Sequence, residues 1–246
     1  MGKVIVVTSG KGGTGKTTAV AAISSCLAAL GHRTLCVDCD AGLRNLDISL
    51  GMSDFTVADI ADVTDGGMSV ADAAHEHPLI PGLFFLSAPG FRSPEEIDHQ
   101  AMARLFGEAR KGFDYCLFDS PAGLGAGFAL AVSGADMAIL VATGDVSSLR
   151  DAQRTAETLR DRGMGELSLL INRLSRRGWG ALLSTLDDVV DDVGARLIGV
   201  VREDSAVSLS ANTDKPLILY EDRGAARDFL DAARRIAGEP LPIIPR

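Results

Sequence analysis

A short segment near the start of the chain has the residue types and the spacing of a phosphate-binding loop. It consists of Gly10, Lys11, Gly12, Gly13, Thr14, Gly15, Lys16 and Thr17. It fits the pattern G-x-x-x-x-G-K-[ST] and contains a second lysine, Lys11. Glycines let backbone N–H groups approach phosphate oxygens, while Lys16 would reach the β- and γ-phosphates and the Thr17 hydroxyl would bind Mg²⁺. The segment, with Thr18 after it, predicts a site for a nucleoside triphosphate and Mg²⁺.

Acidic residues at the ends of two apolar runs could take part in phosphate chemistry. Asp40 comes shortly after the run 34–38, and Asp119 ends the run 115–119. An acid at the end of a hydrophobic strand binds Mg²⁺ directly or through water in proteins that transfer phosphoryl groups, and we expect this of Asp119. We expect Asp40 to hold or orient water near the γ-phosphate. Gly123 begins a segment rich in Gly and Ala that is expected to move when the γ-phosphate leaves.

A polar pair after a third apolar run is a candidate for contacts with the base. Asn172 and Arg173 follow residues 168–171, and the Asn172 amide is expected to hydrogen-bond the edge of the base, with Arg173 beside it. Asp and Asn at strand ends are also common turn and cap residues, and each position taken alone fits that role equally well. Agreement with the loop favours the functional interpretation for Asp40 and Asp119. For Asn172 both interpretations stay open.

The loop and these polar residues follow apolar runs that alternate with helical patterns. Strands are predicted at residues 4–7, 34–38, 83–87, 115–119, 137–142, 168–171 and 197–200, with a last short strand at 216–220. Helices are predicted at residues 18–30, 94–110, 147–161, 181–192 and 225–237, and Gly31 and Gly163 are placed to end two of them.

The order of these elements predicts the fold class. Strands that are nearly continuous in Val, Ile and Leu indicate a sheet buried on both faces. We therefore predict a doubly wound α/β fold, in which helices cover both faces of a mostly parallel sheet, as in P-loop NTPases. Ligands of such sheets bind beyond the carboxyl ends of the strands, where the loop and the acids lie. A single domain, residues 1–246, would end in a short Pro-rich tail, residues 238–246.

Composition restricts the class of partner and the location. The chain has 24 Lys and Arg against 33 Asp and Glu, a net charge of −9, and an acidic protein is poorly suited to DNA as its main partner. No apolar stretch approaches the length of about 20 residues that spans a membrane, and no secretion signal precedes the first predicted strand. We expect a cytoplasmic protein.

Cysteines are the remaining candidates for metal or redox chemistry. Cys36 and Cys39 have the C-x-x-C spacing, and Cys26 and Cys116 are isolated. Residues three apart on a strand point to opposite faces, so Cys36 and Cys39 would share an ion only if the strand ended before Cys39. Buried, reduced thiols are the favoured interpretation.

Several segments together resemble the MinD/ParA family of ATPases, whose deviant Walker A motif is marked by the extra lysine in the loop. Residues 42–47, Gly-Leu-Arg-Asn-Leu-Asp, resemble MinD-type members more closely than ParA partition proteins. Residues 119–123, 146–151, 198–204 and 215–219 also resemble the MinD type. The resemblance extends from Gly2 to about Pro240, nearly the whole chain.

The resemblance implies an ATPase that dimerises with two ATP molecules between its subunits. Lys11 would reach the nucleotide of the other subunit and stabilise charge on its phosphates. Lys16 would hold the phosphates of its own ATP, and Asp40 would position the attacking water. Thr17 would bind the Mg²⁺ ion and Asp119 its water shell. Such ATPases are slow alone, so we expect a low basal rate that a protein partner raises.

Further residues would form the dimer interface and the switch. Asp38 and Asp151 would pair with Lys11 when the dimer is apart, and Asn45 would line the interface. Gly123 and Ser147 complete this set, and Asn172 would contact adenine.

The chain departs from the family at two places. Arg202 stands where the family often has proline, so the residues that form the wall around the adenine are not assigned. MinD proteins typically end in an amphipathic helix that binds the membrane, but Pro240, Pro242 and Pro245 prevent a stable helix here, and no basic cluster accompanies them. The helix before the tail carries apolar residues on one face, which we expect to pack in the core: Phe229, Leu230, Ala233 and Ile236. A peripheral position on the inner face of the cell membrane stays open, without an evident anchor.

Four functional classes follow. The leading one is a MinD-type switch, driven by ATP, that positions the cell-division site. A ParA-like or flagellar-number regulator would position other cargo. An iron–sulfur carrier ATPase would need cysteines that bridge two subunits, and no cysteine follows Cys116. A nucleotide-binding module without catalysis is the fourth, against which the presence of Lys11, Lys16, Asp40 and Asp119 weighs.

Overall fold

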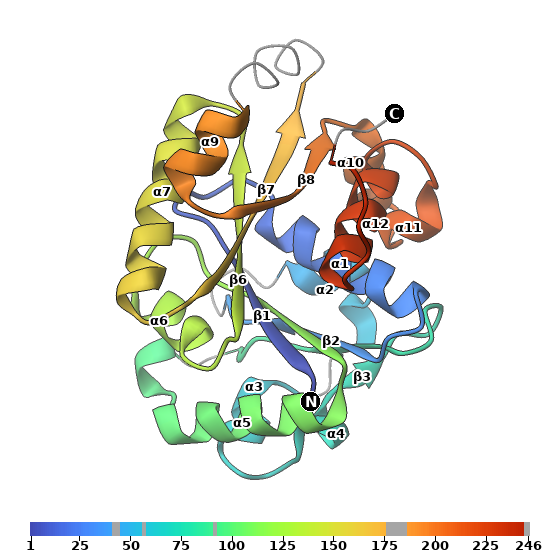
Figure 1. Ribbon diagram of the computed structural model, residues 1–246. Coiled ribbons are helices and arrows are strands. Elements are labelled where there is room, and N and C mark those ends of the chain that lie inside the picture. The colour runs from blue at the N-terminus through green and yellow to red at the C-terminus, as the bar shows by residue number, and fades with distance from the viewer. Residues whose placement is uncertain (41–44, 56–57, 91–92, 176–185, 244–246) are drawn as a thin grey trace.

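The computed structural model describes residues 1–40, 45–55, 58–90, 93–175 and 186–243. Within these residues, strands β1 to β8 form one sheet in the order β3-β4-β2-β5-β1-β6-β7-β8 (Figure 1). Neighbouring strands are parallel, except that β3 is antiparallel to β4. The strands are β1 (Lys3–Thr8), β2 (Thr34–Asp38), β3 (His75–Glu76), β4 (Leu83–Leu86), β5 (Tyr115–Asp119), β6 (Met137–Thr143), β7 (Glu166–Leu174) and β8 (Arg196–Arg202).

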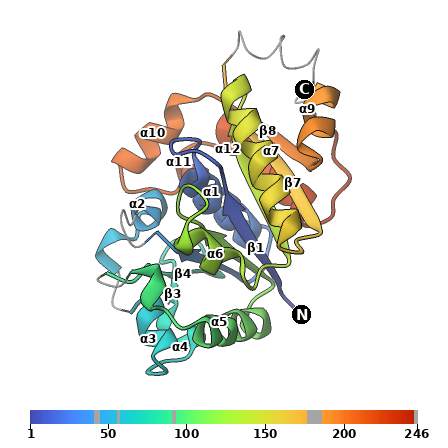
Figure 2. The ribbon, with the colours of Figure 1, turned by 90° about the vertical axis from the view of Figure 1, so that its left-hand side faces the viewer.

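Helices cover both faces of the sheet, as Figures 1 and 2 show from two sides. One face carries α1 (Lys16–Ala29), α2 (Leu46–Leu50), α10 (Ser205–Asn212), α11 (Leu217–Tyr220) and α12 (Ala225–Ile236). The other carries α3 (Ile60–Thr64), α4 (Val70–Ala73), α5 (His99–Gly112), α6 (Ala126–Val132), α7 (Val146–Asp161) and α9 (Leu186–Val193). Short 3-10 helices lie at Ser53–Phe55 and Pro94–Glu96. The predicted doubly wound, mostly parallel fold is confirmed.

The central strand β1 shows why the apolar runs are nearly continuous. Val4 and Val6 belong to the apolar cluster on one face of the sheet, whereas Ile5 and Val7 belong to the cluster on the other. All four side chains are fully buried. A strand with helices on both sides needs apolar residues at successive positions, because neighbouring side chains point to opposite faces.

The topology brings the predicted chemical residues to one edge of the sheet. In the register of the parallel strands, Val7 lies opposite Asp119, and Asp119 lies opposite Asp38. The chain runs from β1 toward β2 on one side and places β6 on the other side, so the loop after β1 lies where the strand order reverses. This is the usual ligand position in doubly wound sheets.

The last predicted strand is wrong. Residues 217–220 form the short helix α11, which begins after Pro216 and closes with a hydrogen bond from Glu221 N–H to the Leu217 carbonyl, 3.0 Å. In a strand, Leu217 and Leu219 would share one face, but Leu217 is 5% exposed and Leu219 is 44% exposed. A short apolar run does not distinguish a strand from one turn of helix, and here the adjacent residues Leu217 and Ile218 both pack on the core, as helix neighbours can and strand neighbours on one face cannot.

Other differences concern helix ends. The predicted helix 94–110 is two elements, because Asp98 accepts hydrogen bonds from Gln100 N–H (3.3 Å) and Ala101 N–H (3.1 Å) and so begins α5 anew. The first part of the predicted helix 181–192 lies outside the described residues, and α9 covers the rest. The short elements α2, α3, α4, α6, α10 and β3 were not predicted. Gly31 and Gly163 follow α1 and α7 with φ of 92° and 86°, as expected.

The end of the chain lies against the edge strand β8. Arg235 of α12 donates to the Ile198 carbonyl of β8 (2.9 Å) and to the Leu241 carbonyl of the tail (3.2 Å). The predicted core face of α12 is confirmed: Phe229 and Ala233 are fully buried, and Leu230 and Ile236 pack against the same cluster. Of the Pro-rich tail, residues 238–243 are described and form no helix, while 244–246 lie outside the described residues.

Candidate nucleotide-binding site

The phosphate-binding loop joins β1 to α1 in a conformation that requires glycine. Gly13 and Gly15 have φ of 80° and 90°, a region that favours glycine, and Gly15 is the N-cap of α1. A Cβ at Gly15 would lie 2.3 Å from the Asn172 amide nitrogen. The first backbone N–H groups of α1 have no acidic side chain beside them in the first turn, so they are available to an anion.

Helix α7 packs directly on the start of this loop. A Cβ at Gly10 would lie 2.7 Å from the Asp151 carbonyl oxygen and 2.8 Å from the Thr155 hydroxyl. The loop therefore keeps its position only with glycine here. The sequence assigned Asp151 to the switch, and the structure adds a packing role for its backbone.

Lys16 is buried among the acids at the sheet edge. Its side chain belongs to a residue only 8% exposed. Burial lowers the pKa of its ammonium group, while the charges of Asp119 and Asp40 act in the opposite direction. Phosphate oxygens stabilise the charged form of a lysine in these surroundings, because each negative charge offsets the cost of removing the ammonium group from water.

Thr17 and Asp119 already lie together as the predicted metal site requires. The Thr17 hydroxyl donates to Asp119 Oδ2 at 2.6 Å. Asp119 is 2% exposed, and burial raises the pKa of its carboxyl to about 7, although the hydrogen bond from Thr17 acts to lower that pKa. Its second oxygen, Oδ1, is buried without a hydrogen-bond partner. A hydroxyl beside a carboxylate that has one unpartnered buried oxygen suits Mg²⁺, which binds oxygen ligands and keeps several waters.

Asp38 organises the segment that carries Asp40. Its carboxylate accepts the Asp40 N–H at 2.8 Å and the Leu46 N–H at 3.4 Å. Asp38 is 2% exposed, and burial raises the pKa of its carboxyl to about 6. It thus binds the backbone on both sides of residues 41–44, which lie outside the described residues. Asp40 is half-buried, and its charge acts on Lys16.

Asn172 and Arg173 connect β7 to the loop. The Asn172 amide donates to the Thr14 carbonyl at 2.9 Å, and its oxygen accepts the Arg173 N–H at 2.9 Å. Arg173, with φ of 56°, also donates to the Gly13 carbonyl at 3.2 Å. Both residues therefore position the loop, a role that the sequence did not indicate. The contact with adenine stays a prediction.

Lys11 differs from Lys16 in its surroundings. It is exposed, and among the described residues it forms no ion pair with Asp38 or Asp151. Hydrogen bonds from the Thr143 hydroxyl and the Ser148 N–H lower the pKa of Asp145 most, and the charge of Lys11 contributes a smaller effect in the same direction. Asp145 is the N-cap of α7 and was not among the predicted site residues. An Asp after an apolar run and before a helical pattern is the signal that could have identified it.

The remaining interface candidates lie around the loop on separate elements. Asn45 is the exposed N-cap residue of α2, and Ser147 is exposed in the first turn of α7. Gly123 has φ of 86° with open space at its Cβ position. Two large apolar side chains beside them were not predicted: Leu124 is 44% exposed and Val146 is 66% exposed. The interface role of this set stays a prediction.

Arg202 is held by an ion pair with α12. Its guanidinium donates to both carboxylate oxygens of Asp228 in α12, at 2.7 and 2.8 Å, and its backbone N–H donates to the same carboxylate at 3.0 Å. The carboxylate is buried, and the arginine side chain is 45% exposed. This pair fixes the end of β8 to α12.

Other chemistry finds little support in the described part of the chain. All four cysteines are free thiols: Cys26, Cys36 and Cys116 are buried and Cys39 is half-buried. Burial raises the pKa of Cys26 and Cys116 to about 12, so neither is a ready thiolate. The described residues hold no group of three His, Cys, Asp or Glu side chains placed to bind a metal. No helix among them has the length and apolar character needed to cross a membrane.

A glycine loop between the first strand and helix, with a buried lysine and a threonine–aspartate pair, defines a P-loop nucleoside-triphosphate-binding protein. Comparison with known proteins gives the family. The CobQ/CobB/MinD/ParA nucleotide binding domain matches residues 5–217. The chain belongs to this family, as a MinD-like member of the MinD/ParA deviant Walker A ATPases.

Relatives and solved structures resemble it over nearly their whole length. A septum site-determining protein MinD from Synechocystis sp. is 36% identical over 99% of this chain and 92% of its own. The MinC:MinD cell division protein complex of Aquifex aeolicus contains a chain of 36% identity and TM-score 0.89, with 99% and 98% of the two chains covered. MinD of Pyrococcus horikoshii complexed with Mg-ADP has 25% identity and TM-score 0.83, with 97% of each chain covered.

Proposed function

We propose that this chain is an ATP-hydrolysing dimerisation switch of the MinD type that takes part in placing the cell-division site. ATP would favour the dimer, the dimer would bind a partner, and hydrolysis would return the subunits to monomers. The names of its relatives support the cell-division role, and the magnesium–nucleotide complex of the Pyrococcus horikoshii protein supports ATP and Mg²⁺ as ligands.

The observation that carries the proposal is the contrast between the two lysines of the loop. Lys16 is buried and lies within the field of Asp119 and Asp40, where it can hold the phosphates of its own nucleotide. Lys11 is exposed, although it lies only five positions earlier in the same loop. An exposed lysine beside a phosphate site can reach a nucleotide bound to a second subunit, where it would stabilise charge as an arginine finger does.

The other residues complete the reaction. Thr17 and Asp119 would hold Mg²⁺, which when bound neutralises charge on the β- and γ-phosphates. Asp40 would orient the attacking water, and Asp38 would hold Asp40 through its backbone N–H. The monomer lacks the lysine of a second subunit, so we expect slow hydrolysis until the dimer and a partner complete the site.

The proposal extends to partner and location. The Aquifex aeolicus complex contains MinC, so we propose a MinC-like protein as a partner of this chain. We further propose that the switch works in the cytoplasm and reaches the inner face of the cell membrane through its protein partner.

Size measurement of trapped protein tests the switch. Asp40→Ala should bind ATP and barely hydrolyse it, so light scattering after gel filtration should give a dimer with ATP·Mg²⁺ and a monomer with ADP. Lys16→Gln, which lacks the lysine that holds the phosphates, should stay monomeric under both conditions. A protein that is monomeric in every condition, while still binding ATP, would overturn the dimerisation switch and leave a nucleotide-binding module.

The same samples test location and partner. Sedimentation of the ATP-bound dimer with anionic liposomes would indicate direct membrane binding, and absence from the pellet would favour a route through a protein. Lys11→Ala should abolish the rise in turnover that accompanies dimer formation. A turnover rate unaffected by this substitution would contradict the role assigned to Lys11.

A further inference from the structure

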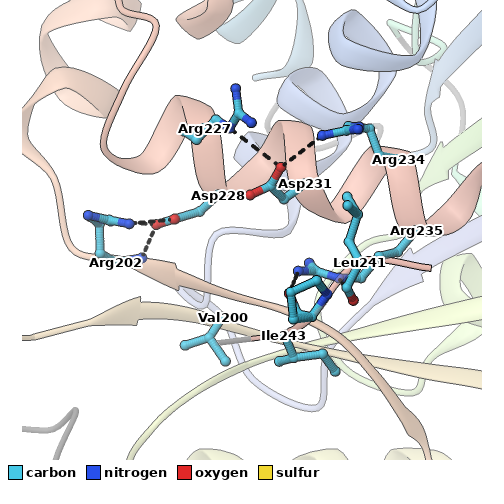
Figure 3. Close-up of a pocket in the computed structure, with 10 residues that line it drawn as sticks. Val200, Arg202, Arg227, Asp228, Asp231, Arg234, Arg235, Leu241 and Ile243 are labelled. Atoms are coloured by element: carbon cyan, nitrogen blue, oxygen red, sulfur yellow. Dashed lines mark hydrogen bonds and ion pairs between the residues drawn. The ribbon is translucent and has the colours of Figure 1, made fainter. Parts of the chain in front are cut away.

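A hollow lies at the edge of the sheet away from the phosphate-binding loop, between β8, α12 and the tail. It has a volume of about 410 Å³, and none of its lining residues belongs to the phosphate-binding loop (Figure 3). Arg202 lies at one end and Arg235 at the other, with α12 forming the wall between them (Figure 3). Val200, Leu241 and Ile243 supply apolar lining.

The hollow is basic although the protein is acidic. Among the described residues that line it, four are arginines and two are aspartates. The chain as a whole has a net charge of −9. A concave surface with excess guanidinium groups attracts an anion more strongly than a flat surface does, because the low-dielectric walls focus the field.

Two of these arginines are already hydrogen-bonded within the protein. Arg202 binds the buried Asp228 through two guanidinium nitrogens. Arg235 is 7% exposed and donates to backbone carbonyls of β8 and the tail. Both therefore hold elements together, and removing either would leave buried polar groups without partners.

Arg227 and Arg234 are held differently. Their guanidiniums share one oxygen of Asp231, at 3.5 and 3.7 Å, as Figure 3 shows. Charge-assisted hydrogen bonds are usually about 2.7–2.9 Å long, so neither contact is a full one. The Arg227 side chain is 55% exposed, and Asp231 is its one ion-pair partner within the described part of the chain. Most of its five N–H donors are available to a ligand.

The tail indicates which ligand suits this surface. Glu239 binds Arg234, with a shortest distance of 2.7 Å, and the chain then runs on through Pro240 and Leu241 without helix. Further along, Ile243 packs against the core. A non-helical, proline-containing segment with one carboxylate and apolar residues after it is therefore already bound to α12 through Arg234.

We propose that the open part of this hollow, at Arg227 and the exposed side of Arg202, binds an acidic extended segment of a partner protein. A Glu or Asp side chain of the segment would accept from Arg227 in place of Asp231, and an apolar residue after it would lie against Val200 and Leu241. A concave site between a helix and a chain segment admits a peptide, whereas a bilayer needs a surface that it can cover. The proposal does not depend on ATP binding.

Binding of a labelled peptide to the full chain tests the proposal. The probe is a fluorescein-labelled peptide with the sequence of residues 238–243, Gly-Glu-Pro-Leu-Pro-Ile, and the readout is fluorescence anisotropy at low salt. We expect Arg227→Gln to weaken binding about tenfold, the effect of losing one charge-assisted hydrogen bond. Asp231→Asn should tighten it severalfold, because the competing carboxylate is gone. Arg104→Gln, on the exposed side of α5, removes the same charge elsewhere and should leave binding unchanged.

Other ligands decide the remaining outcomes. A probe with Gln in place of Glu should bind as weakly as the intact probe binds Arg227→Gln. If millimolar inorganic phosphate displaces the labelled peptide as well as unlabelled peptide does, the hollow is a simple anion site and the proposal is overturned. Binding to phosphatidylglycerol vesicles or to a DNA duplex that is lost in Arg227→Gln, without peptide binding, would overturn it in favour of those surfaces. No peptide binding, in protein whose circular dichroism matches the wild type, would also overturn it.

Discussion

At the scale of single residues, the backbone conformation of the phosphate-binding loop and its close contacts require glycine. Gly15 has φ of 90°, and a Cβ there would lie 2.3 Å from the Asn172 amide nitrogen. Asn172 in turn donates to the Thr14 carbonyl, so displacing its side chain disturbs the loop from both sides. The glycine thus serves the loop through its contact with β7 as well as through its conformation.

Gly15→Ala is therefore expected to weaken ATP binding at least about tenfold, because the left-handed conformation costs an alanine about 1–2 kcal/mol even before the contact with Asn172 is counted. Gly13→Ala is the matched control, since Gly13 also has a positive φ, 80°, but a Cβ there meets no atom within 4 Å. Titration of a fluorescent ATP analogue measures both. Equal affinities for the two variants would refute the contact between Gly15 and Asn172 as a determinant of the loop.

The residues that could be predicted from sequence are those whose neighbours in the chain define their role. Lys16 and Thr17 belong to one contiguous pattern, and Asp119 ends an apolar run. The hydrogen bond of 2.6 Å between Thr17 and Asp119 then follows, because the carboxyl ends of neighbouring parallel strands lie at the same edge of the sheet. Asn172 as a support of the loop could not be predicted, because its partner Thr14 lies far away in the sequence and any amide can make such a bond. Arg202 is similar, since Asp228 is part of a different element.

At the scale of elements, one carboxylate begins two helices. Asp204 is the N-cap of α10 and accepts the Ala206 N–H at 3.0 Å with one oxygen. Its other oxygen accepts the Ala225 N–H, the first residue of α12, also at 3.0 Å. Gly224 allows this approach, since a Cβ there would lie 2.0 Å from the Asp204 carboxylate.

Asp204→Ala should therefore lower the free energy of unfolding by about 2 kcal/mol, the sum of two caps at about 1 kcal/mol each. Asp98→Ala, which removes the cap of α5 alone, should cost about half of that. Urea unfolding followed by circular dichroism gives both values. An Asp204→Ala effect no larger than that of Asp98→Ala would mean that the second cap contributes nothing.

The helices predicted best are the long amphipathic ones, and the reason is physical. Helix α7 has enough turns for its apolar period to be recognised, and Gly163 marks its end. Helix α11 consists of residues 217–220 only, and its run of apolar residues fits a strand equally well. The exposure of Leu219 in the structure distinguishes the two. Short elements depend on what packs against them, and the sequence pattern carries no such information.

Another connection between elements makes stability depend on pH. His77, 3% exposed, donates from Nε2 to the Leu50 carbonyl at the end of α2, because a carbonyl can only accept. Its Nδ1 accepts the N–H groups of Leu79 (3.0 Å) and Ile80 (3.1 Å). Burial lowers the pKa of the imidazole, against the hydrogen bond to Leu50. Protonation of Nδ1 would oppose two N–H donors, so the folded protein holds a neutral ring.

The unfolded chain binds a proton at this histidine near pH 6.5, and the folded protein does so only at lower pH. The contribution of His77 is thus complete above the unfolded pKa and is lost as the pH falls through about 6.5 toward the folded pKa. Urea unfolding of the wild type and His77→Gln should give a stability difference that narrows as the pH drops. The exposed His99→Gln is the control. A difference independent of pH would show that the ring titrates alike in both states.

At the scale of the whole molecule, the site of one chain is incomplete if Lys11 acts on a second copy. Asp40 would then serve the nucleotide of its own subunit, and Lys11 would serve the nucleotide of the other. Two inactive variants, Lys11→Ala and Asp40→Ala, should restore activity when they are mixed. In a mixed dimer, the nucleotide on the Lys11→Ala subunit has its own Asp40 and receives an intact Lys11 from the Asp40→Ala subunit.

Random pairing makes half of the dimers mixed, and each mixed dimer has one complete site of two, so the equimolar mixture should reach about a quarter of wild-type turnover at saturating protein. Phosphate release from ATP·Mg²⁺, measured for each variant alone and for mixtures over a range of ratios, checks this. Turnover should also fall on dilution, because the active species is a dimer. If Lys11 instead acts on the nucleotide of its own chain, every mixture stays inactive, because neither kind of subunit then has both residues.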